Sequence, residues 1–88
     1  MKETTTSGPV THINPQRAMI AVAVEGNGYT IIELIGDEVE IGDVLTWKEW
    51  MPLGGGSVYS RDQDRSFDVY FQNHAVNPGQ LRQQLLYE

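Results

Sequence analysis

The side chains best suited to bind a metal ion are two histidines and a closely spaced pair of aspartates. His12 and His74 are far apart in the sequence, and neither has a partner at His-x-x-x-His spacing. Asp62 and Asp64 form an Asp-x-Asp pair similar to the start of a calcium-binding loop. The position of that loop's sharp-turn glycine is occupied by Phe67, and its final glutamate is missing. We therefore expect no metal site.

Motifs for phosphate binding and nucleophilic catalysis are also missing. The Gly-Gly-Gly-Ser run at 54–57 lacks the Gly-Lys-Ser/Thr ending of a phosphate loop, so we expect a flexible linker. The chain has no cysteine, which excludes thiol nucleophiles, disulfides, iron–sulfur clusters and cysteine zinc sites. No serine lies in a nucleophile-type context. We expect a protein that is not an enzyme and needs no cofactor.

The charge of the chain is acidic. Acidic residues outnumber basic residues by 12 to 6, giving a formal net charge of −6. The basic residues are scattered, and only Arg61 and Arg65 are near neighbours. Since affinity for nucleic acid comes mainly from Lys and Arg side chains that neutralise phosphates, the charge disfavours a nucleic-acid partner without excluding one.

The length and the N-terminal region indicate one soluble domain. We expect residues 1–8 to be a disordered tail and residues 9–88 to form a single domain. The N-terminal residues have no apolar core of the kind that a signal peptide needs. The longest apolar run, 18–24, is far shorter than the ~20 residues that span a bilayer. We expect a cytoplasmic protein that does not contact a membrane.

Short β-branched or alternating segments bounded by turn residues predict five or six strands, at 9–13, 18–25, 29–35, 44–51, 58–60 and 67–72. Turns are expected at 14–17, 26–28 and 61–66, and loops at 36–43 and 52–57. In the second strand, alternation should direct Ile20, Val22 and Val24 into the core. Alternation also predicts that Trp47 and Trp50 lie on opposite faces of one strand. The pattern is typical of a small antiparallel barrel.

One segment, 78–87, predicts a C-terminal helix. Asn77 is suited to be its N-cap, Pro78 its first residue and Gln80 the partner of a capping box. The helix should pack on the barrel through an apolar face formed by Leu81, Leu85 and Leu86.

Residues 13–18, Ile-Asn-Pro-Gln-Arg-Ala, resemble the Phe-Asn-Pro-Glu-Lys-Gly that ends the first strand and begins the second in cold-shock domains. The segment 39–47 is similar to the start of that family's fourth strand. The resemblance covers about residues 9–50. It implies an all-β fold, a five- to six-stranded antiparallel OB-fold barrel with one C-terminal helix. An SH3-like barrel is the alternative.

Cold-shock domains stack nucleic-acid bases on aromatic side chains of their second and third strands. None of the matching residues here is aromatic; they are Met19, Ala21, Ile31 and Glu33. Each stacked base contributes about 1–3 kcal/mol, so the missing rings would remove useful affinity by that route. Arg17 does match a basic position of the family.

The outward face of the second and third strands is instead small and apolar. Such a face is an unusual surface to leave in water. The chain's own helix could cover it, or a protein partner or second copy could do so, and we weigh the two equally. Our main hypothesis is a non-enzymatic OB-fold interaction module that binds a protein partner or self-associates. Its candidate partner-binding residues are Met19, Ala21, Ala23 and Ile31.

The alternative hypothesis is a cold-shock-like protein that binds single-stranded RNA or DNA through a relocated surface. Aromatic side chains would supply stacking and arginines would neutralise phosphates. The candidate residues are Arg17, Trp50, Tyr59, Arg61 and Arg65. A small-molecule ligand is a third alternative, although no convergent polar pocket is evident in the sequence.

Overall fold

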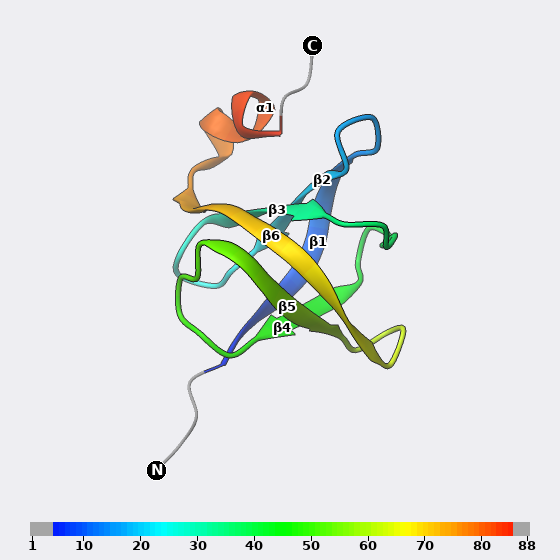
Figure 1. Ribbon diagram of the computed structural model, residues 1–88. Helices are drawn as coiled ribbons and strands as arrows, with labels where there is room; N and C mark the ends of the chain where they lie inside the picture. Colours follow the sequence, from blue (N-terminus) through cyan, green and yellow to red (C-terminus); the bar gives the residue numbers. More distant parts are fainter. Residues whose placement is uncertain (1–4, 86–88) are drawn as a thin grey trace.

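A computed structural model describes residues 5–85 of the chain. These residues form six strands and a short C-terminal helical segment (Figure 1). The strands are β1 (Thr6–Asn14), β2 (Met19–Ala23), β3 (Tyr29–Leu34), β4 (Val44–Trp47), β5 (Gly54–Ser60) and β6 (Arg65–Val76), followed by the 3-10 turn η1 (Pro78–Gln80) and the helix α1 (Leu81–Gln84). The predicted mainly β architecture is confirmed.

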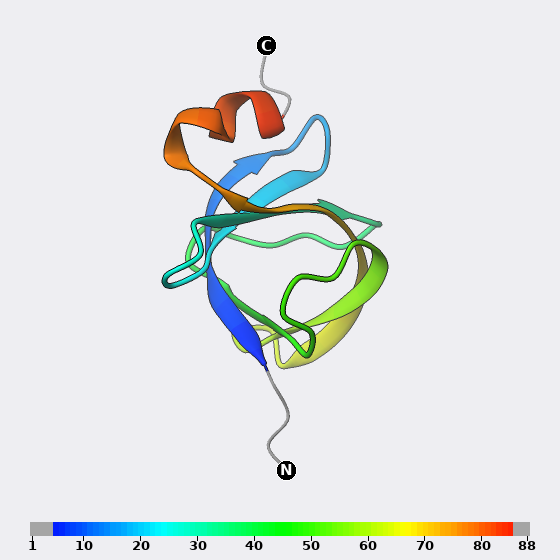
Figure 2. The same ribbon diagram turned by 90° about the vertical axis from the view of Figure 1, so that its left-hand side faces the viewer.

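The strands close into a barrel in the order β1-β2-β3-β6-β5-β4, and β4 pairs again with β1 (Figure 2). All six pairings are antiparallel. Closure removes the long unpaired edges that an open sheet would expose to water. None of the helices within residues 5–85 has the length and apolar character needed to cross a membrane.

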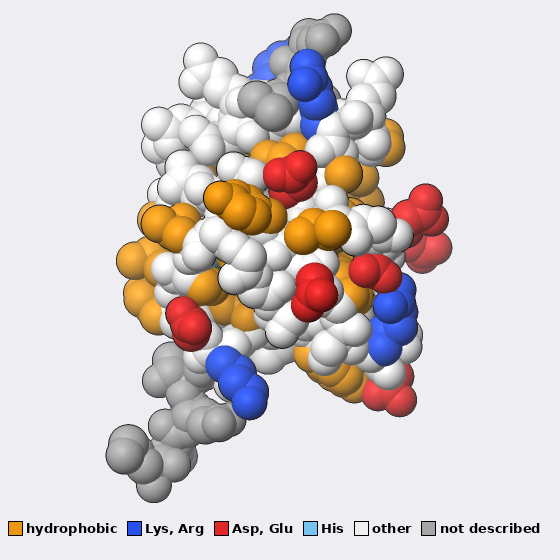
Figure 3. Space-filling model, in the orientation of Figure 1, with side chains coloured by type: hydrophobic (Ala, Val, Ile, Leu, Met, Phe, Trp, Pro, Cys, Tyr) orange, Lys and Arg blue, Asp and Glu red, His pale blue; other side chains and the backbone are white. Residues whose placement is uncertain are grey.

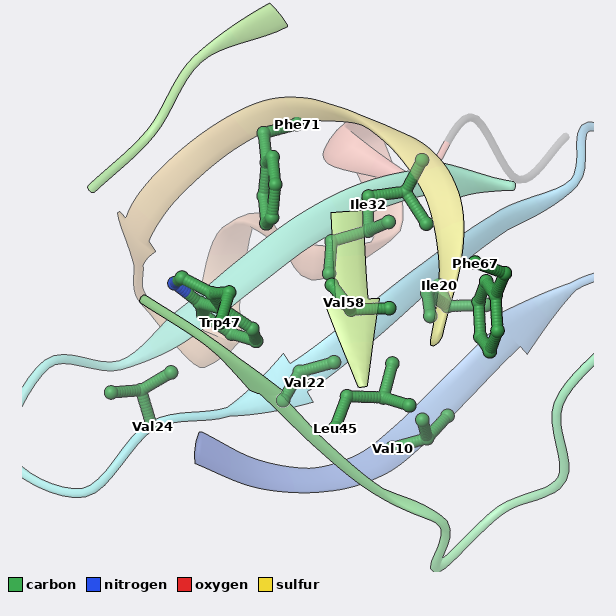
Figure 4. Packing of buried hydrophobic residues seen from close by; sticks show 11 residues of the cluster. Val10, Ile20, Val22, Val24, Ile32, Leu45, Trp47, Val58, Phe67 and Phe71 are labelled. Carbon is green, nitrogen blue, oxygen red and sulfur yellow. The ribbon is translucent and has the colours of Figure 1, made fainter. Parts of the chain in front are cut away.

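Alternate side chains of the strands fill the barrel, as predicted for Ile20, Val22 and Val24. The Trp47 ring meets the Phe71 ring edge-on, with centroids 5.5 Å apart. Figure 4 shows this core, to which every strand contributes: Val10, Ile20, Val22, Val24, Ile32, Leu45, Trp47, Val58, Phe67, Val69 and Phe71.

A second, smaller cluster lies outside the barrel wall, between α1 and the outer face of β2 and β3 (Figures 1 and 2). The Asn14 side-chain amide fastens the end of the helix by donating to the Leu85 carbonyl at 2.8 Å. The cluster consists of Met19, Ala21, Ile31, Val76, Leu81 and Leu85. The sequence left open whether the chain's own helix or a partner covers this face. In the structure the chain's own helix covers it.

The Gly-rich segment was predicted as a flexible loop, and this prediction is wrong from Gly54 onward. Gly54–Ser60 is strand β5, paired along its whole length with β6. At Gly56 a Cβ atom would lie 2.9 Å from Cε2 of Phe71, closer than real Cβ contacts. The missing side chain therefore makes room for a core ring, a long-range requirement that a local pattern does not reveal.

Several strand ends also differ from the prediction. β4 ends at Trp47, so alternation does not extend to Trp50, which lies in the following bend. β1 begins at Thr6, so residues 6–8 pair with β4 and belong to the barrel rather than to a tail. β6 continues to Val76, beyond the expected end at 72. The rest of the predicted tail, residues 1–4, lies outside the described residues.

The C-terminal helix is shorter than expected. A 3-10 turn precedes a single α-helical turn, and the Asn77 side chain makes no capping hydrogen bond. The predicted capping box is therefore wrong, although Pro78 does begin the first turn. Leu81 and Leu85 are buried as expected, while Leu86 and the rest of the predicted helix lie outside the described residues.

The turn between β5 and β6 is tied to β4 by Asp62. Its carboxylate accepts a hydrogen bond from the Val44 backbone N–H at 2.8 Å, and this bond, aided by Arg61, lowers the pKa of Asp62. A lowered folded-state pKa stabilises the fold above the unfolded-state value of about 4. That stabilisation is lost as the pH falls through the folded-state pKa.

We therefore expect Asp62→Asn to lose part of the acid sensitivity of the wild-type fold. Thermal unfolding followed by circular dichroism should show a steeper fall in midpoint below about pH 4 in the wild type than in the variant. Equal slopes in the two proteins would contradict this role of Asp62.

Candidate functional site

The residues predicted to bind a partner lie under α1. Met19 is 5% exposed, and Ala21 and Ile31 are fully buried beneath Leu81 and Leu85. Ala23, at the end of β2, is half-buried. With the helix in place, this face offers little surface to a partner, and a candidate site must be sought elsewhere on the barrel.

The predicted nucleic-acid residues do not meet on one surface. The β1–β2 turn that carries Arg17 lies beside α1, whereas the β5–β6 turn lies at the opposite end of the barrel (Figures 1 and 2). Arg61 lies 3.5 Å from an oxygen of Asp62. Arg65 forms a 2.7 Å ion pair with Asp37. These two arginines are thus already engaged with carboxylates of the same chain.

The barrel wall has an opening beyond the end of β4, where β5 continues without β4 beside it. The β4–β5 ladder consists of two pairs, Leu45 with Ser60 and Thr46 with Tyr59. Residues 54–57 extend beyond the end of β4 and pair only with β6 among the strands of the described chain. The connecting loop, 48–53, leaves the end of β4 after Trp47 and joins β5 at Gly54 (Figure 1).

The loop is fastened at its far end by His74 on β6. The His74 ring contacts the Pro52 carbonyl through Nε2 and the Thr30 hydroxyl through Nδ1, the latter at 3.0 Å. The same ring stacks on Phe71, with centroids 5.9 Å apart. His74 therefore has a structural role, because it ties the end of the loop to β6 and β3. The other histidine, His12, bonds to the Thr11 hydroxyl on β1.

A cavity of about 410 Å³ occupies the space between the loop and β5. This volume lies within the range of roughly 300–1,000 Å³ that is typical of ligand pockets. Two of the three core aromatic residues, Trp47 and Phe71, line its wall. Its other lining residues come from β4, the loop, β5 and β6: Thr46, Lys48, Glu49, Pro52, Leu53, Gly55, Gly56, Ser57, Val58, Tyr59 and Ser66.

Trp47 carries a hydrogen-bond donor that the described part of the chain leaves unsatisfied. The residue is 3% exposed, and its indole Nε1 has no hydrogen-bond partner. In Figure 4 this nitrogen lies on the side of the ring away from Leu45 and Val58. A buried donor without an acceptor costs about 1–3 kcal/mol, so an acceptor supplied from outside would recover that energy.

Exposed apolar side chains are concentrated beside the cavity. Four of the seven large hydrophobic residues exposed on the described chain lie between 50 and 59: Trp50, Met51, Leu53 and Tyr59. Leu53, which lines the cavity, is 70% exposed. Figure 3 shows hydrophobic side chains gathered at the left of the view, where the loop lies in Figure 1. We refer to the cavity and these four side chains as the β4–β5 opening.

Tyr59 adds an aromatic surface to the β4–β5 opening. Its hydroxyl donates a hydrogen bond to the Asp64 carboxylate. This hydrogen bond, with smaller contributions from desolvation and the Asp64 charge, raises the pKa of Tyr59 above its ordinary value. The ring therefore stays neutral at physiological pH, and its hydroxyl is already bonded. Tyr59 is suited to apolar contact rather than to acid–base chemistry.

A second cavity, of about 660 Å³, lies between the 36–43 loop and the β5–β6 turn and is lined mainly by carboxylates. Within residues 5–85 no group of histidine, aspartate or glutamate side chains is arranged to hold a metal ion. The Asp43 carboxylate instead accepts hydrogen bonds from the Glu40 backbone and the Gln63 side chain. These contacts give the carboxylate a structural role in the loop.

Sequence reasoning named Trp50 and Tyr59 by residue type but missed the opening beside them. The opening exists because β4 is shorter, and β5 longer, than the local patterns predict. Trp47 was not among the residues predicted for either binding surface, although it lines the cavity. No family model, curated protein or solved structure matches the chain.

Proposed function

We propose that this chain is a non-enzymatic interaction module that binds a protein partner through the β4–β5 opening. The observation that carries the proposal is the cavity of about 410 Å³ with exposed apolar side chains at its rim. Exposed apolar side chains concentrated on one part of a surface are typical of protein-binding sites. The surface predicted from the sequence, on β2 and β3, is replaced in this proposal because α1 covers it.

The proposal extends to the family of the barrel, an OB-like fold related to cold-shock domains. Residues 15–18 form the turn between β1 and β2, the position that the family segment occupies. Ala18 matches the final glycine of that segment and has a φ of 55°. Glycine adopts this left-handed conformation without steric cost, which supports the resemblance at the level of the backbone.

The cysteine-free sequence supports a cytoplasmic location.

A matched pair of charged variants tests the proposal. Leu53→Asp places a carboxylate beside the opening, whereas Ile41→Asp does the same at a comparably exposed residue, 61% against 70%, in the 36–43 loop. We expect proteins enriched from lysate by the wild type to remain enriched by Ile41→Asp and to be lost with Leu53→Asp. Quantitative mass spectrometry measures the enrichment. Equal enrichment by the two variants, or none by the wild type, would contradict the proposal.

Self-association is a form of the same proposal, in which a second copy is the partner. Light scattering over a range of protein concentrations detects it. A dimer of the wild type that Leu53→Asp dissociates and Ile41→Asp preserves would identify the second copy as the partner.

Single-stranded nucleic acid is the second candidate ligand, favoured by the exposed rings of Trp50 and Tyr59. Stacking of bases on such rings is tolerant of sequence. Its weakness is that Arg61 and Arg65 are engaged with carboxylates. Fluorescence anisotropy with labelled oligonucleotides at low salt, the condition that most favours phosphate contacts, should show no binding if the partner is a protein.

A further inference from the structure

We infer that the β4–β5 opening accepts an extended, net-basic peptide segment of the partner, which adds a strand to the open part of β5 and places an apolar side chain in the cavity. This inference rests on the proposed function and specifies the chemistry of the partner. Addition of an extended peptide to a sheet edge is a recurring mode of recognition, in which backbone hydrogen bonds supply affinity and pockets for side chains supply specificity.

The backbone of β5 presents hydrogen-bonding groups to the opening. The Arg61 N–H donates to the Val44 carbonyl at 3.0 Å, so the backbone groups of Arg61 face β4. In an antiparallel strand the direction of these groups alternates from one residue to the next. The β5 residues that share the direction of Arg61 are Tyr59, Ser57 and Gly55. Tyr59 meets Thr46, whereas the other two lie beyond the end of β4 and face the opening.

The side chains of this part of β5 leave room for a second backbone. Gly55 has no atom within 4 Å of the place where a Cβ would lie. The backbone of Gly56 lies close to the ring of Phe71, and Phe71 forms part of the cavity wall. Ser57 is small and exposed. Glycine in a strand often marks a place where another backbone approaches closely, and this part of β5 has that composition.

The indole of Trp47 is a second and independent sign of a ligand. The residue lines the cavity, is almost wholly buried, and holds the donor without a partner described above. An extended peptide carries one carbonyl acceptor per residue and so offers this donor what the chain itself does not. The cavity is lined by one cationic and one anionic side chain, Lys48 and Glu49. Asp68 lies directly opposite Ser57 in the ladder and adds a negative charge beside the open part of β5. Together with the net charge of −6, Asp68 favours a peptide rich in Lys and Arg.

The test begins with a displayed library of random peptides, selected against the full chain. We expect the selected peptides to combine Lys or Arg with alternating apolar residues. A synthesised peptide is then titrated into the isotope-labelled chain and followed by NMR. The amide resonances of Gly55 and Ser57 and the indole N–H resonance of Trp47 should shift. The chain has two tryptophans, so Trp50→Phe assigns the indole signal.

Two further measurements separate strand addition from other modes of binding. A peptide methylated at alternate backbone nitrogens cannot complete the ladder and should bind at least about tenfold more weakly. Ser57→Pro removes one backbone N–H that faces the opening, at an edge position where proline is tolerated, and should weaken binding by a similar factor. Ser57→Ala keeps the N–H and should bind within about twofold of the wild type. The methylated peptide tests the wild-type chain and so does not depend on folding of the proline variant.

The inference is overturned if no peptide is selected, if methylation leaves affinity unchanged, or if the shifts map away from β5 and Trp47. It is also overturned if a second copy or an oligonucleotide, rather than a peptide, produces the shifts. A partner that is captured by the wild type and lost with Leu53→Asp would in these cases leave the proposed function standing. If the chain neither binds a peptide nor captures a partner, both the inference and the proposed function are contradicted.

Discussion

Gly8→Ala is expected to destabilise the fold by at least about 3 kcal/mol, the upper end of the usual cost of overpacking. Gly8 lies on β1, where it pairs with Leu45 of β4. A Cβ atom added there would lie 1.8 Å from the Ala23 carbonyl oxygen. Because the obstacle is backbone of β2 rather than a flexible side chain, the barrel must shift to accept the methyl group. Urea unfolding followed by Trp47 and Trp50 fluorescence measures the loss.

Gly55→Ala is the matched control for this variant. The added Cβ meets no atom within 4 Å, and the position does not require a positive φ. Its effect should lie between no change and a gain of about 1 kcal/mol, because alanine restricts the unfolded chain. Equal stability of the two variants would show that β1 and β2 do not approach as closely as the structure has them.

Leu85→Ala is expected to cost about 2–5 kcal/mol in the stability of the C-terminal cover, the range for burial of leucine in a core. Leu85 is fully buried against the outer face of β2 and β3. The helical segment is short and contributes only Leu81 and Leu85 to this cluster from its described residues. Without the Leu85 side chain, Met19 and Ile31 should become accessible. Amide hydrogen exchange in β2 and binding of a hydrophobic dye measure the exposure.

Leu53→Ala makes the same chemical change at a side chain that is 70% exposed. It should alter stability by no more than about 0.5 kcal/mol and should not increase dye binding. If Leu85→Ala behaved in the same way, the helix would not be the cover of the β2–β3 face, and that face would return as a candidate surface for a partner.

Local sequence patterns predicted the tight turns, the alternation of buried side chains along the strands and the apolar face of the C-terminal segment. The turn at 26–28 joins two strands, and alternation along the first predicts that Ile20, Val22 and Val24 lie in the core. The structure confirms both the turn and these core residues. Leu81 and Leu85 are spaced by one helical turn, and this spacing correctly predicted that both side chains are buried. The α-helix begins at Leu81 rather than at Pro78, and Asn77 does not form the predicted cap.

The candidate site depends on contacts that are distant in the sequence. Gly56 belongs to a strand because Phe71 lies against it, and nothing in the run of glycines indicates that ring. β4 ends at Trp47, although the following residues could have continued the strand pattern. The opening is the difference between these two strand ends, which is a property of the ladder register rather than of either segment. The unsatisfied donor of Trp47 likewise depends on packing.

In our proposal the β4–β5 opening, rather than the β2–β3 face, is the functional surface of this barrel. The decisive measurement is amide hydrogen exchange of the full chain, with and without the protein partner that it captures. We expect new protection at Gly55 and Ser57 and no change at Met19 or Ile31. Protection confined to β2 and β3, accompanied by faster exchange in α1, would contradict it and would show that the helix gives way to the partner.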